Sequence, residues 1–164
     1  MADSRMVMRY EEELYMNTGT TSTPVWTRIG EGFTEAGVSF NGQTYTVKYI
    51  SDKNERNYLV GYSPEIGFDA NIYTNNPVME KILDVIKQEK LGTDALCQIV
   101  IVDAYEWDGI GPNVAPARKR DWTIVPEGMS SGVEALLMNG AFQSAGETEF
   151  GTFNRDTQTF IPAP

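Results

Sequence analysis

The sequence predicts a mainly β domain of the α+β class, a β-sandwich or barrel-like fold with one flanking helix. Polar and apolar residues alternate with period two over residues 44–49, 58–62 and 66–73, which is the pattern of strands with one packed face. A single amphipathic helical stripe comes after Asn76-Pro77. Residues 96–102 are almost continuously apolar, as in a strand that is covered on both faces.

The first 25 residues differ in composition from the rest of the chain. They contain the charged run 11–13 and then a Thr-, Ser- and Gly-rich run over residues 17–24. We expect residues 1–25 to form an N-terminal arm ahead of the core, ordered by a partner. The folded body is then expected over residues 26–150, and its first segment, 26–38, fits a short strand bent at its glycines.

A long hairpin is predicted next. Its first arm alternates through Tyr45, Val47 and Tyr49, and its second arm is kinked at Ser63-Pro64, because proline removes a ladder donor. The loop between the arms, residues 51–57, carries charges of both signs. It is either a solvated turn or a set of contacts that fixes the register of a neighbouring copy. The candidate contact residues are Asp52, Lys53, Asn54, Glu55 and Arg56.

One helix is predicted over about residues 77–91. Asn75 or Asn76 is the expected N-cap and Pro77 the first helical residue, where its missing N–H has no cost. Gly92 is expected to end the helix. The buried stripe consists of Val78, Ile82, Val85 and Ile86.

The second half of the chain predicts further strands and a loop. A Gly- and Pro-rich loop is expected over residues 103–116, with Tyr105 and Trp107 in it. Strands are expected at 121–125, 133–140 and 141–148, with a break at Pro126-Glu127-Gly128. Residues 151–164 then form an ordered C-terminal arm: a glycine turn, a short strand, a polar turn and an aromatic residue before two prolines.

Composition excludes several functions. The chain has 13 Lys and Arg against 23 Asp and Glu, a net charge of −10, which argues against binding nucleic acid through its phosphates. It has no histidine, which removes Ser-His-Asp and Cys-His catalysis and His-ligated metal sites. Its one cysteine, Cys97, lies among apolar residues and is predicted to be a buried, inert thiol. We therefore expect no cofactor and no metal.

No catalytic constellation emerges from the remaining residues. Carboxylates cluster at 11–13, at 103–108 and at Glu147 with Glu149, but none lies in an apolar setting that raises its pKa for acid catalysis. Solvated faces explain them better. The two Gly-x-Gly sequences, at 30–32 and 109–111, do not join a strand to a helix and do not indicate a phosphate loop. The chain is therefore expected not to be an enzyme.

The order of these elements resembles that of the major tail tube proteins of long, non-contractile-tailed bacteriophages and of related phage-tail-like particles. The resemblance covers most of residues 26–161, with Asn154 standing where Asp is more common. It is carried by the segments Trp26-Thr27-Arg28-Ile29-Gly30, Val47-Lys48-Tyr49-Ile50, Gly61-Tyr62-Ser63-Pro64-Glu65-Ile66 to Phe68, Asn76-Pro77, 99–103, 118–126, Gly151-Thr152-Phe153-Asn154 and Phe160.

The resemblance implies a structural virion protein that self-assembles into hexameric rings, which stack into a tube for DNA ejection. It implies that residues 51–57 reach an adjacent ring and that the arms 1–24 and 154–164 bridge subunits. The lumen of such tubes is negative, so Glu65, Asp69 and Asn71 are expected to line it. Phe153, Arg155 and Phe160 are expected in a C-terminal strap between subunits.

The resemblance also implies tape-measure and tail-end proteins as partners, passage of DNA without sticking, assembly in the bacterial host cytoplasm and no membrane. Contractile tails share the fold and remain an alternative. A different class of function is a monomeric β-sandwich that binds carbohydrate through Tyr105 and Trp107. A carboxylate-dependent hydrolase is a third, weaker hypothesis.

Overall fold

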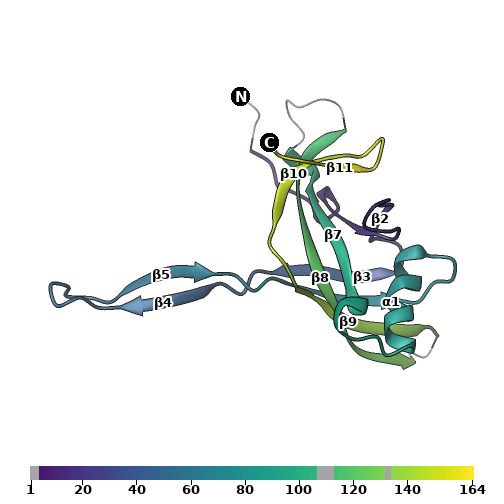
Figure 1. Ribbon diagram of the computed structural model, residues 1–164, viewed down its shortest axis with the longest axis horizontal. Helices are drawn as coiled ribbons and strands as arrows, with labels where there is room; N and C mark the ends of the chain where they lie inside the picture. Colours follow the sequence, from purple (N-terminus) through teal and green to yellow (C-terminus); the bar gives the residue numbers. More distant parts are fainter. Residues whose placement is uncertain (1–3, 107–112, 132–133) are drawn as a thin grey trace.

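The computed structural model describes residues 4–106, 113–131 and 134–164, and their fold is mainly β, as predicted (Figure 1). The strands are β1 (Glu12–Asn17), β2 (Trp26–Arg28), β3 (Phe33–Ser39), β4 (Gln43–Val47), β5 (Arg56–Gly61), β6 (Glu65–Asn71), β7 (Leu96–Asp103), β8 (Val114–Ser131), β9 (Leu136–Ser144), β10 (Glu149–Asn154) and β11 (Thr159–Pro162). The helices are α1 (Pro77–Lys87) and the short 3-10 turns η1 (Arg9–Glu11), η2 (Gly92–Ala95) and η3 (Ala104–Glu106).

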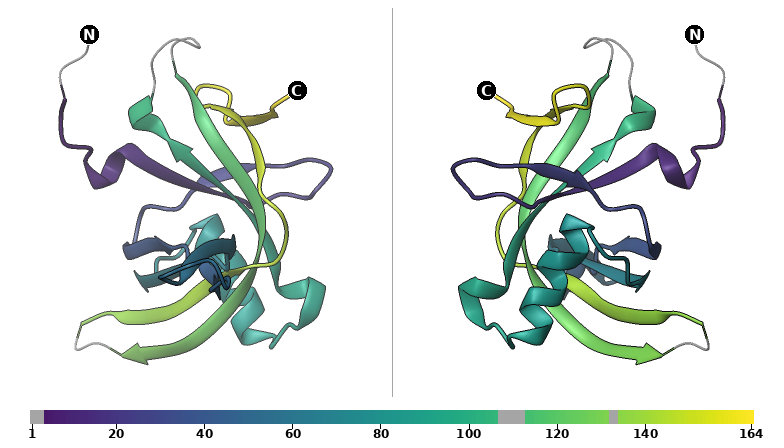
Figure 2. Two further views of the ribbon diagram at one scale, coloured as in Figure 1. Left: turned by 90° about the vertical axis from the view of Figure 1, so that its left-hand side faces the viewer. Right: turned by 90° about the vertical axis from the view of Figure 1, so that its right-hand side faces the viewer.

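Nine strands form one antiparallel sheet, in which seven follow the order β2-β1-β7-β8-β9-β6-β3. β10 pairs with the first half of β8, and β11 pairs with β10. The end-on views show that this sheet curls around α1 (Figure 2). The result is an incompletely closed barrel with one flanking helix, which confirms the predicted fold class.

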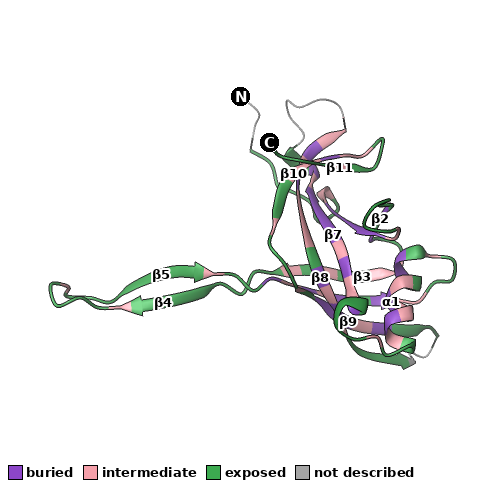
Figure 3. Ribbon diagram, viewed as in Figure 1, coloured by how far each residue is buried: buried purple, intermediate pink, exposed green. Residues whose placement is uncertain are grey.

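The structure contains the predicted hairpin, and it projects out of the body. β3 pairs with β6 inside the main sheet, whereas β4 and β5 pair only with each other. Between these two sheets the chain leaves the ladder around Ser63-Pro64, where the kink is expected. Almost every residue of the outer hairpin is exposed (Figure 3). No other strand of the described chain supports this projection. A two-stranded hairpin is only marginally stable alone in water, so we expect a partner to cover it.

The helix begins where its sequence signals place it. The side chain of Asn76 accepts hydrogen bonds from the backbone N–H groups of Val78 and Met79, at 3.1 and 3.3 Å, which satisfies two of the free donors of the first turn. The helix ends at Lys87, earlier than the expected end near residue 91. Glu89 adopts a positive φ of 49° there, and residues 88–89 form a turn instead.

The main core lies between the curled sheet and α1. Val78, Ile82 and Val85 are buried in it as predicted, and Ile86 packs against it while half-buried. Met79 joins them and is fully buried. From the sheet, the largest contributions are Trp122, Phe142 and Phe68. The helix therefore closes one end of the curled sheet.

The expected N-terminal arm is contradicted over part of its length. Residues 12–17 form β1, which lies between β2 and β7 in the sheet. Leu14 and Met16 are buried in the main core, and Tyr15 is buried on the opposite face. A strand with neighbours on both edges and packing on both faces is an integral part of the body. Residues 4–11 remain outside the sheet and are mostly exposed.

The strand pattern of the second half also differs from expectation. β8 runs unbroken from Val114 to Ser131, so it begins inside the expected loop at 103–116 and has no break at Pro126-Glu127-Gly128. The pairing with β9 shifts between Pro126 and Gly128, and such a bulge accommodates proline within a strand. The two strands expected at 133–140 and 141–148 are replaced by one strand, β9.

Candidate assembly interfaces

The face of the sheet opposite α1 is acidic over four adjacent strands: β3, β6, β9 and the second half of β8. Along β6, Ile66, Phe68 and Ala70 are buried towards the helix. The alternate residues on the opposite face are Glu65, Asp69 and Asn71, of which Asp69 is exposed and the other two are half-buried. The structure therefore places the three predicted lumen residues together on one face.

Carboxylates on this acidic face lie next to one another. Asp69 stands directly opposite Glu35 of β3 and, on its other side, opposite Asn139 of β9. Like charges in directly opposite positions destabilise a sheet. Two carboxylates are thus held in register on adjacent strands, at a local cost to the stability of the sheet.

The charge of this face is of one sign in the sequence as well. β3, β6, β9 and residues 121–131 contain no Lys or Arg. They carry the acidic residues Glu35, Glu65, Asp69, Asp121 and Glu127. Because no basic side chain of these strands neutralises the carboxylates, the face presents a negative field to whatever approaches it.

Both edges of these four strands are open in the described chain. On one side β3 pairs with β6 alone. On the other side β8 pairs with β7 only as far as Thr123, so residues 124–131 have β9 on one edge and no described strand on the other. The Arg9 guanidinium donates to the Ala36 carbonyl oxygen of β3 at 2.6 Å, which covers one acceptor of that edge. Exposed strand edges pair readily with further strands.

Two of the five predicted contact residues, Asp52 and Arg56, contact each other within the hairpin tip. The Arg56 guanidinium donates to Oδ1 of Asp52 at 2.6 Å and lies 5.5 Å from the centroid of the Tyr49 ring. The side chains of Lys53, Asn54 and Glu55 are exposed, and so is the whole of Ile50. The tip is thus a shaped turn that presents these three polar side chains and one apolar one.

The three residues expected in a C-terminal strap contact their own chain. The Phe153 ring is fully buried, 4.4 Å from the Tyr15 ring, and Phe160 packs against the same cluster. Arg155 forms an ion pair with Glu13 at 2.7 Å. These side chains hold β10 and β11 on the body. A contact of the arm with a neighbouring copy remains a prediction, and it has to use the outer edge of β11 and the residues after it.

Glu13 is a residue whose role the sequence does not reveal. It belongs to the run 11–13, for which a solvated face is the expectation, yet only 3% of its side chain is exposed. It accepts a hydrogen bond from the Tyr15 hydroxyl at 2.8 Å and pairs with Arg28 and Arg155. The signal available is the apolar run Leu14-Tyr15-Met16 directly after it, which favours a buried strand.

Of the two aromatic residues in the carbohydrate hypothesis, Tyr105 and Trp107, only Tyr105 is among the described residues. Tyr105 is exposed on η3, and nearby Asp103 raises the pKa of its hydroxyl. Trp107 lies outside the described residues. Nothing described beside Tyr105 forms the stacked aromatic platform that the hypothesis needs.

The acidic side chains and the cysteine of the described chain do not gather in one cluster. Among the described residues, no group of three or more Asp, Glu and Cys side chains gathers as a metal site would require. Cys97 is buried, as predicted, and burial raises the pKa of its thiol to about 12. The described helices include none that is long and apolar enough to cross a membrane.

Comparison with known proteins finds structural matches but no sequence matches. No protein-family model matches the chain, and no curated protein matches its sequence. Among solved structures, it superposes on a chain of the tail of an empty gene transfer agent particle, determined with C6 symmetry, with a TM-score of 0.61 at 13% identity. The match covers 88% of this chain and 98% of the other. The chain has the fold of a tail-particle subunit.

Two further particle structures share this fold. The virion of the native gene transfer agent contains a chain that matches with a TM-score of 0.58 at 13% identity, over 88% of this chain and 98% of that one. The six-fold symmetrised baseplate of the anti-feeding prophage contains one with a TM-score of 0.51 at 9% identity, over 94% and 98%. Tail-like particles are thus the common setting of these three matches.

Proposed function

We propose that the chain is a structural, non-enzymatic subunit of a phage-tail-like particle. Copies assemble into hexameric rings, the rings stack into a hollow tail tube, and DNA passes through the tube when it is ejected into the host. The observation that carries this proposal is the acidic face bounded by two open strand edges. The shared fold of the sixfold-symmetric tail supports it.

The open edges suggest how a ring closes. β3 of one copy pairs with residues 124–131 of the next, so that each copy adds four strands to a common barrel. Such a contact is heterologous, and it closes when the rotation per copy divides a full turn. Closure leaves no exposed edge in the barrel, and exposed edges otherwise lead to uncontrolled aggregation.

The acidic face then becomes the inner wall. Asp69, Glu65 and Asn71 line the lumen in this arrangement, and Glu35 lies beside Asp69. DNA phosphates are repelled by a wall that carries carboxylates and no basic residue of these strands, so the DNA slides without sticking. The like-charge pair between Glu35 and Asp69 is the local cost of that property.

The hairpin provides the contact between rings. It extends far from the body (Figure 1), and almost all of its strand residues are exposed, so a neighbouring copy has to cover it. Lys53, Asn54 and Glu55 at the tip reach the adjacent ring. In the particle, tape-measure and tail-end proteins are the expected partners, and assembly takes place in the bacterial host cytoplasm.

Negative-stain microscopy of concentrated protein tests the proposal. We expect rings or tubes for the full chain. A variant in which a short glycine-rich turn replaces residues 43–61 removes only the separate two-stranded sheet, so its body should fold and give single rings that do not stack. Monodisperse monomers at every concentration of the full chain would contradict the proposal, and glycan binding by those monomers would favour the carbohydrate hypothesis.

A further inference from the structure

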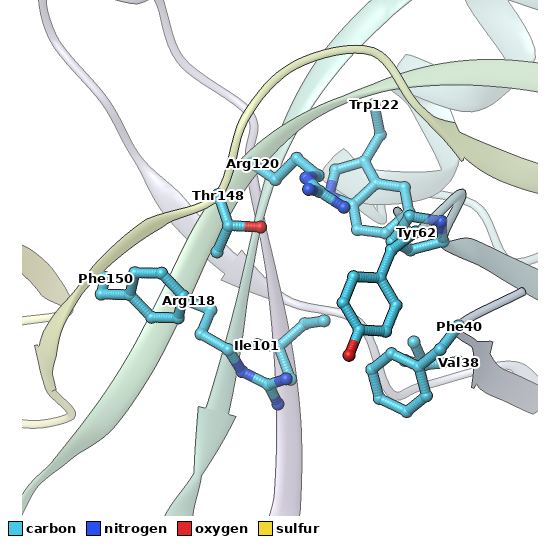
Figure 4. Close-up of a pocket in the computed structure, with 10 residues that line it drawn as sticks. Val38, Phe40, Tyr62, Ile101, Arg118, Arg120, Trp122, Thr148 and Phe150 are labelled. Atoms are coloured by element: carbon cyan, nitrogen blue, oxygen red, sulfur yellow. The ribbon is translucent and has the colours of Figure 1, made fainter. Parts of the chain in front are cut away.

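The end of the curled sheet beside the hairpin base is open, in contrast to the end that α1 closes. A cavity of about 450 Å³ lies there. Figure 4 shows Phe40 and Tyr62 on one side of it, Arg118 and Phe150 on the other, and Trp122 with Arg120 at one end. We call this cavity the barrel mouth. Its walls are mostly apolar, and the Phe40, Tyr62 and Phe150 rings on its rim are exposed.

Three buried donors at the barrel mouth have no hydrogen-bond partner in the described chain. They are Nε of Arg118, Nε of Arg120 and Nε1 of Trp122. Arg118 also donates to Asp103 at 3.3 Å through its Nη2 atom, whereas the Arg120 guanidinium lies over the Trp122 ring, 6.0 Å from its centroid. The guanidinium groups of Arg118 and Arg120 make the lining of the mouth positively charged, so an occupant that carries a carboxylate is favoured.

The occupant therefore needs an apolar group beside a carboxylate. The turn after α1, residues 88–94, offers both. Leu91 is 82% exposed, and Glu89 and Asp94 are exposed on either side of it. The turn is also held in shape: the Lys90 N–H donates to the Val85 carbonyl at 3.1 Å, and the Asp94 N–H donates to the Leu91 carbonyl at 3.2 Å. A leucine presented this way is left uncovered by the described chain.

The two surfaces are separate parts of the body. Phe40 and Tyr62 flank the hairpin base, and α1 lies at the far end of the body from the hairpin (Figure 1). A contact between the mouth of one copy and the turn of the next is head-to-tail, so it leaves both surfaces free at the ends and repeats.

We propose that the barrel mouth is the receptor for the turn 88–94 of a second copy in the adjacent ring. Leu91 enters the apolar cavity, and the carboxylates of Asp94 and Glu89 meet Arg120 and Arg118. This inference rests on the proposed function and names a second contact between rings beside the hairpin. The hairpin tip fits the mouth less well, because residues 48–56 carry three basic and two acidic side chains and would meet two arginines.

Disulfide trapping tests the contact directly. A chain carrying both Leu91→Cys and Phe150→Cys should give a ladder of covalent oligomers on oxidation of assembled tubes, because each copy supplies one cysteine to each neighbour. Cys97 is buried and gives little background. The matched control, Gln143→Cys with Phe150→Cys, places the second thiol on the acidic face and should give no ladder.

Charge variants test how much these side chains contribute to the contact between copies. Leu91→Asp changes an exposed residue and should fold normally while reducing pelletable tubes at least about tenfold, the loss expected when a charge replaces a buried apolar contact. Arg120→Glu and Asp94→Arg should each reduce assembly, and the double variant should recover it; thermal unfolding confirms that each chain is folded. If the wild type forms tubes but the ladder is absent and Leu91→Asp assembles normally, this inference is wrong and the proposed function stands. If the wild type forms no tubes, both fail.

Discussion

The Arg155 guanidinium lies 2.7 Å from Oε1 of Glu13, a carboxylate that is only 3% exposed in the strand β1. This pair ties the turn after β10 to the opposite end of the sequence. Arg28 approaches the same oxygen at 3.5 Å, and the Tyr15 hydroxyl donates to the other at 2.8 Å. The C-terminal segment is therefore part of the domain's own stability before it contacts any neighbour.

Replacing Arg155 should destabilise the folded subunit. Arg155→Ala leaves the buried Glu13 carboxylate with the more distant Arg28, and losing one partner of a buried pair costs at most about 3–5 kcal/mol. Urea unfolding followed by tryptophan fluorescence measures the change. Arg28→Ala, which removes the longer contact to the same carboxylate, is the matched control and should cost less. Equal stability of Arg155→Ala and the wild type would show that Glu13 does not depend on the pair.

The ion pair between Arg155 and Glu13 also affects how a C-terminal truncation is interpreted. From the sequence, deleting residues 154–164 is expected to leave a folded domain that polymerises poorly. The deletion also removes Arg155 and the Phe160 ring that packs on the second cluster. We therefore expect a less stable subunit, measured by thermal unfolding, as well as poor polymerisation. A truncated protein that forms normal tubes would rule out the strap.

A charge inside the core should prevent folding. Ile82 is fully buried between α1 and the sheet, so Ile82→Asp loses its packing and also buries a carboxylate without a partner, at a cost of at least about 4 kcal/mol. That is comparable to the whole stability of a domain, and expression trials should find the variant insoluble. Lys87→Asp, on the exposed side of the same helix, should remain soluble and folded.

Reversing a charge on the acidic face should make the tube bind DNA. Asp69→Lys replaces the exposed carboxylate opposite Glu35, so the lumen gains a phosphate contact in each of its subunits. Co-sedimentation of tubes with short DNA should rise and should fall again as salt increases, because phosphate contacts depend on counterion release. Glu80→Lys on α1, away from that face, should leave DNA retention unchanged. Equal retention by both variants would place Asp69 outside the lumen.

The N-terminal segment provides a pH prediction. Side-chain hydrogen bonds from Arg5, at 2.6 and 2.9 Å, together with one from the Met8 N–H, lower the pKa of Glu11 from 4.5 to about 2. A depressed carboxyl pKa stabilises the ordered segment above pH 4.5, and this contribution is lost as the pH falls towards 2. An NMR titration should show the Glu11 pKa rising towards 4.5 in Arg5→Ala. An unchanged titration would assign the shift to the backbone bond alone.

Local signals are enough to predict several elements. The Asn76 cap and Pro77 place the start of α1, because capping depends on residues within one turn. The alternation along β6 separates the core residues Ile66 and Phe68 from the carboxylate of Asp69, because side chains alternate across any strand. The lack of histidine similarly excludes histidine chemistry on composition alone.

Non-local partners decide what local signals miss. β1 is a core strand because β2 and β7 pair with its two edges, and β7 lies in the second half of the chain. Pro126 does not end β8, because the pairing with β9 shifts there in a bulge. The same reason hides Glu13: its burial depends on Arg155, at the far end of the sequence.

The sequence by itself determined the secondary-structure class, the hairpin, the helix start and the acidic character, since each depends on residue type and short spacing. The tertiary structure alone decided that the carboxylates share one face between two open edges, that the C-terminal residues brace their own domain, and that an apolar mouth opposite α1 contains unsatisfied donors. These features depend on side chains that are far apart in the sequence and that the curled sheet brings into contact. A pattern of neighbouring residues cannot predict such contacts.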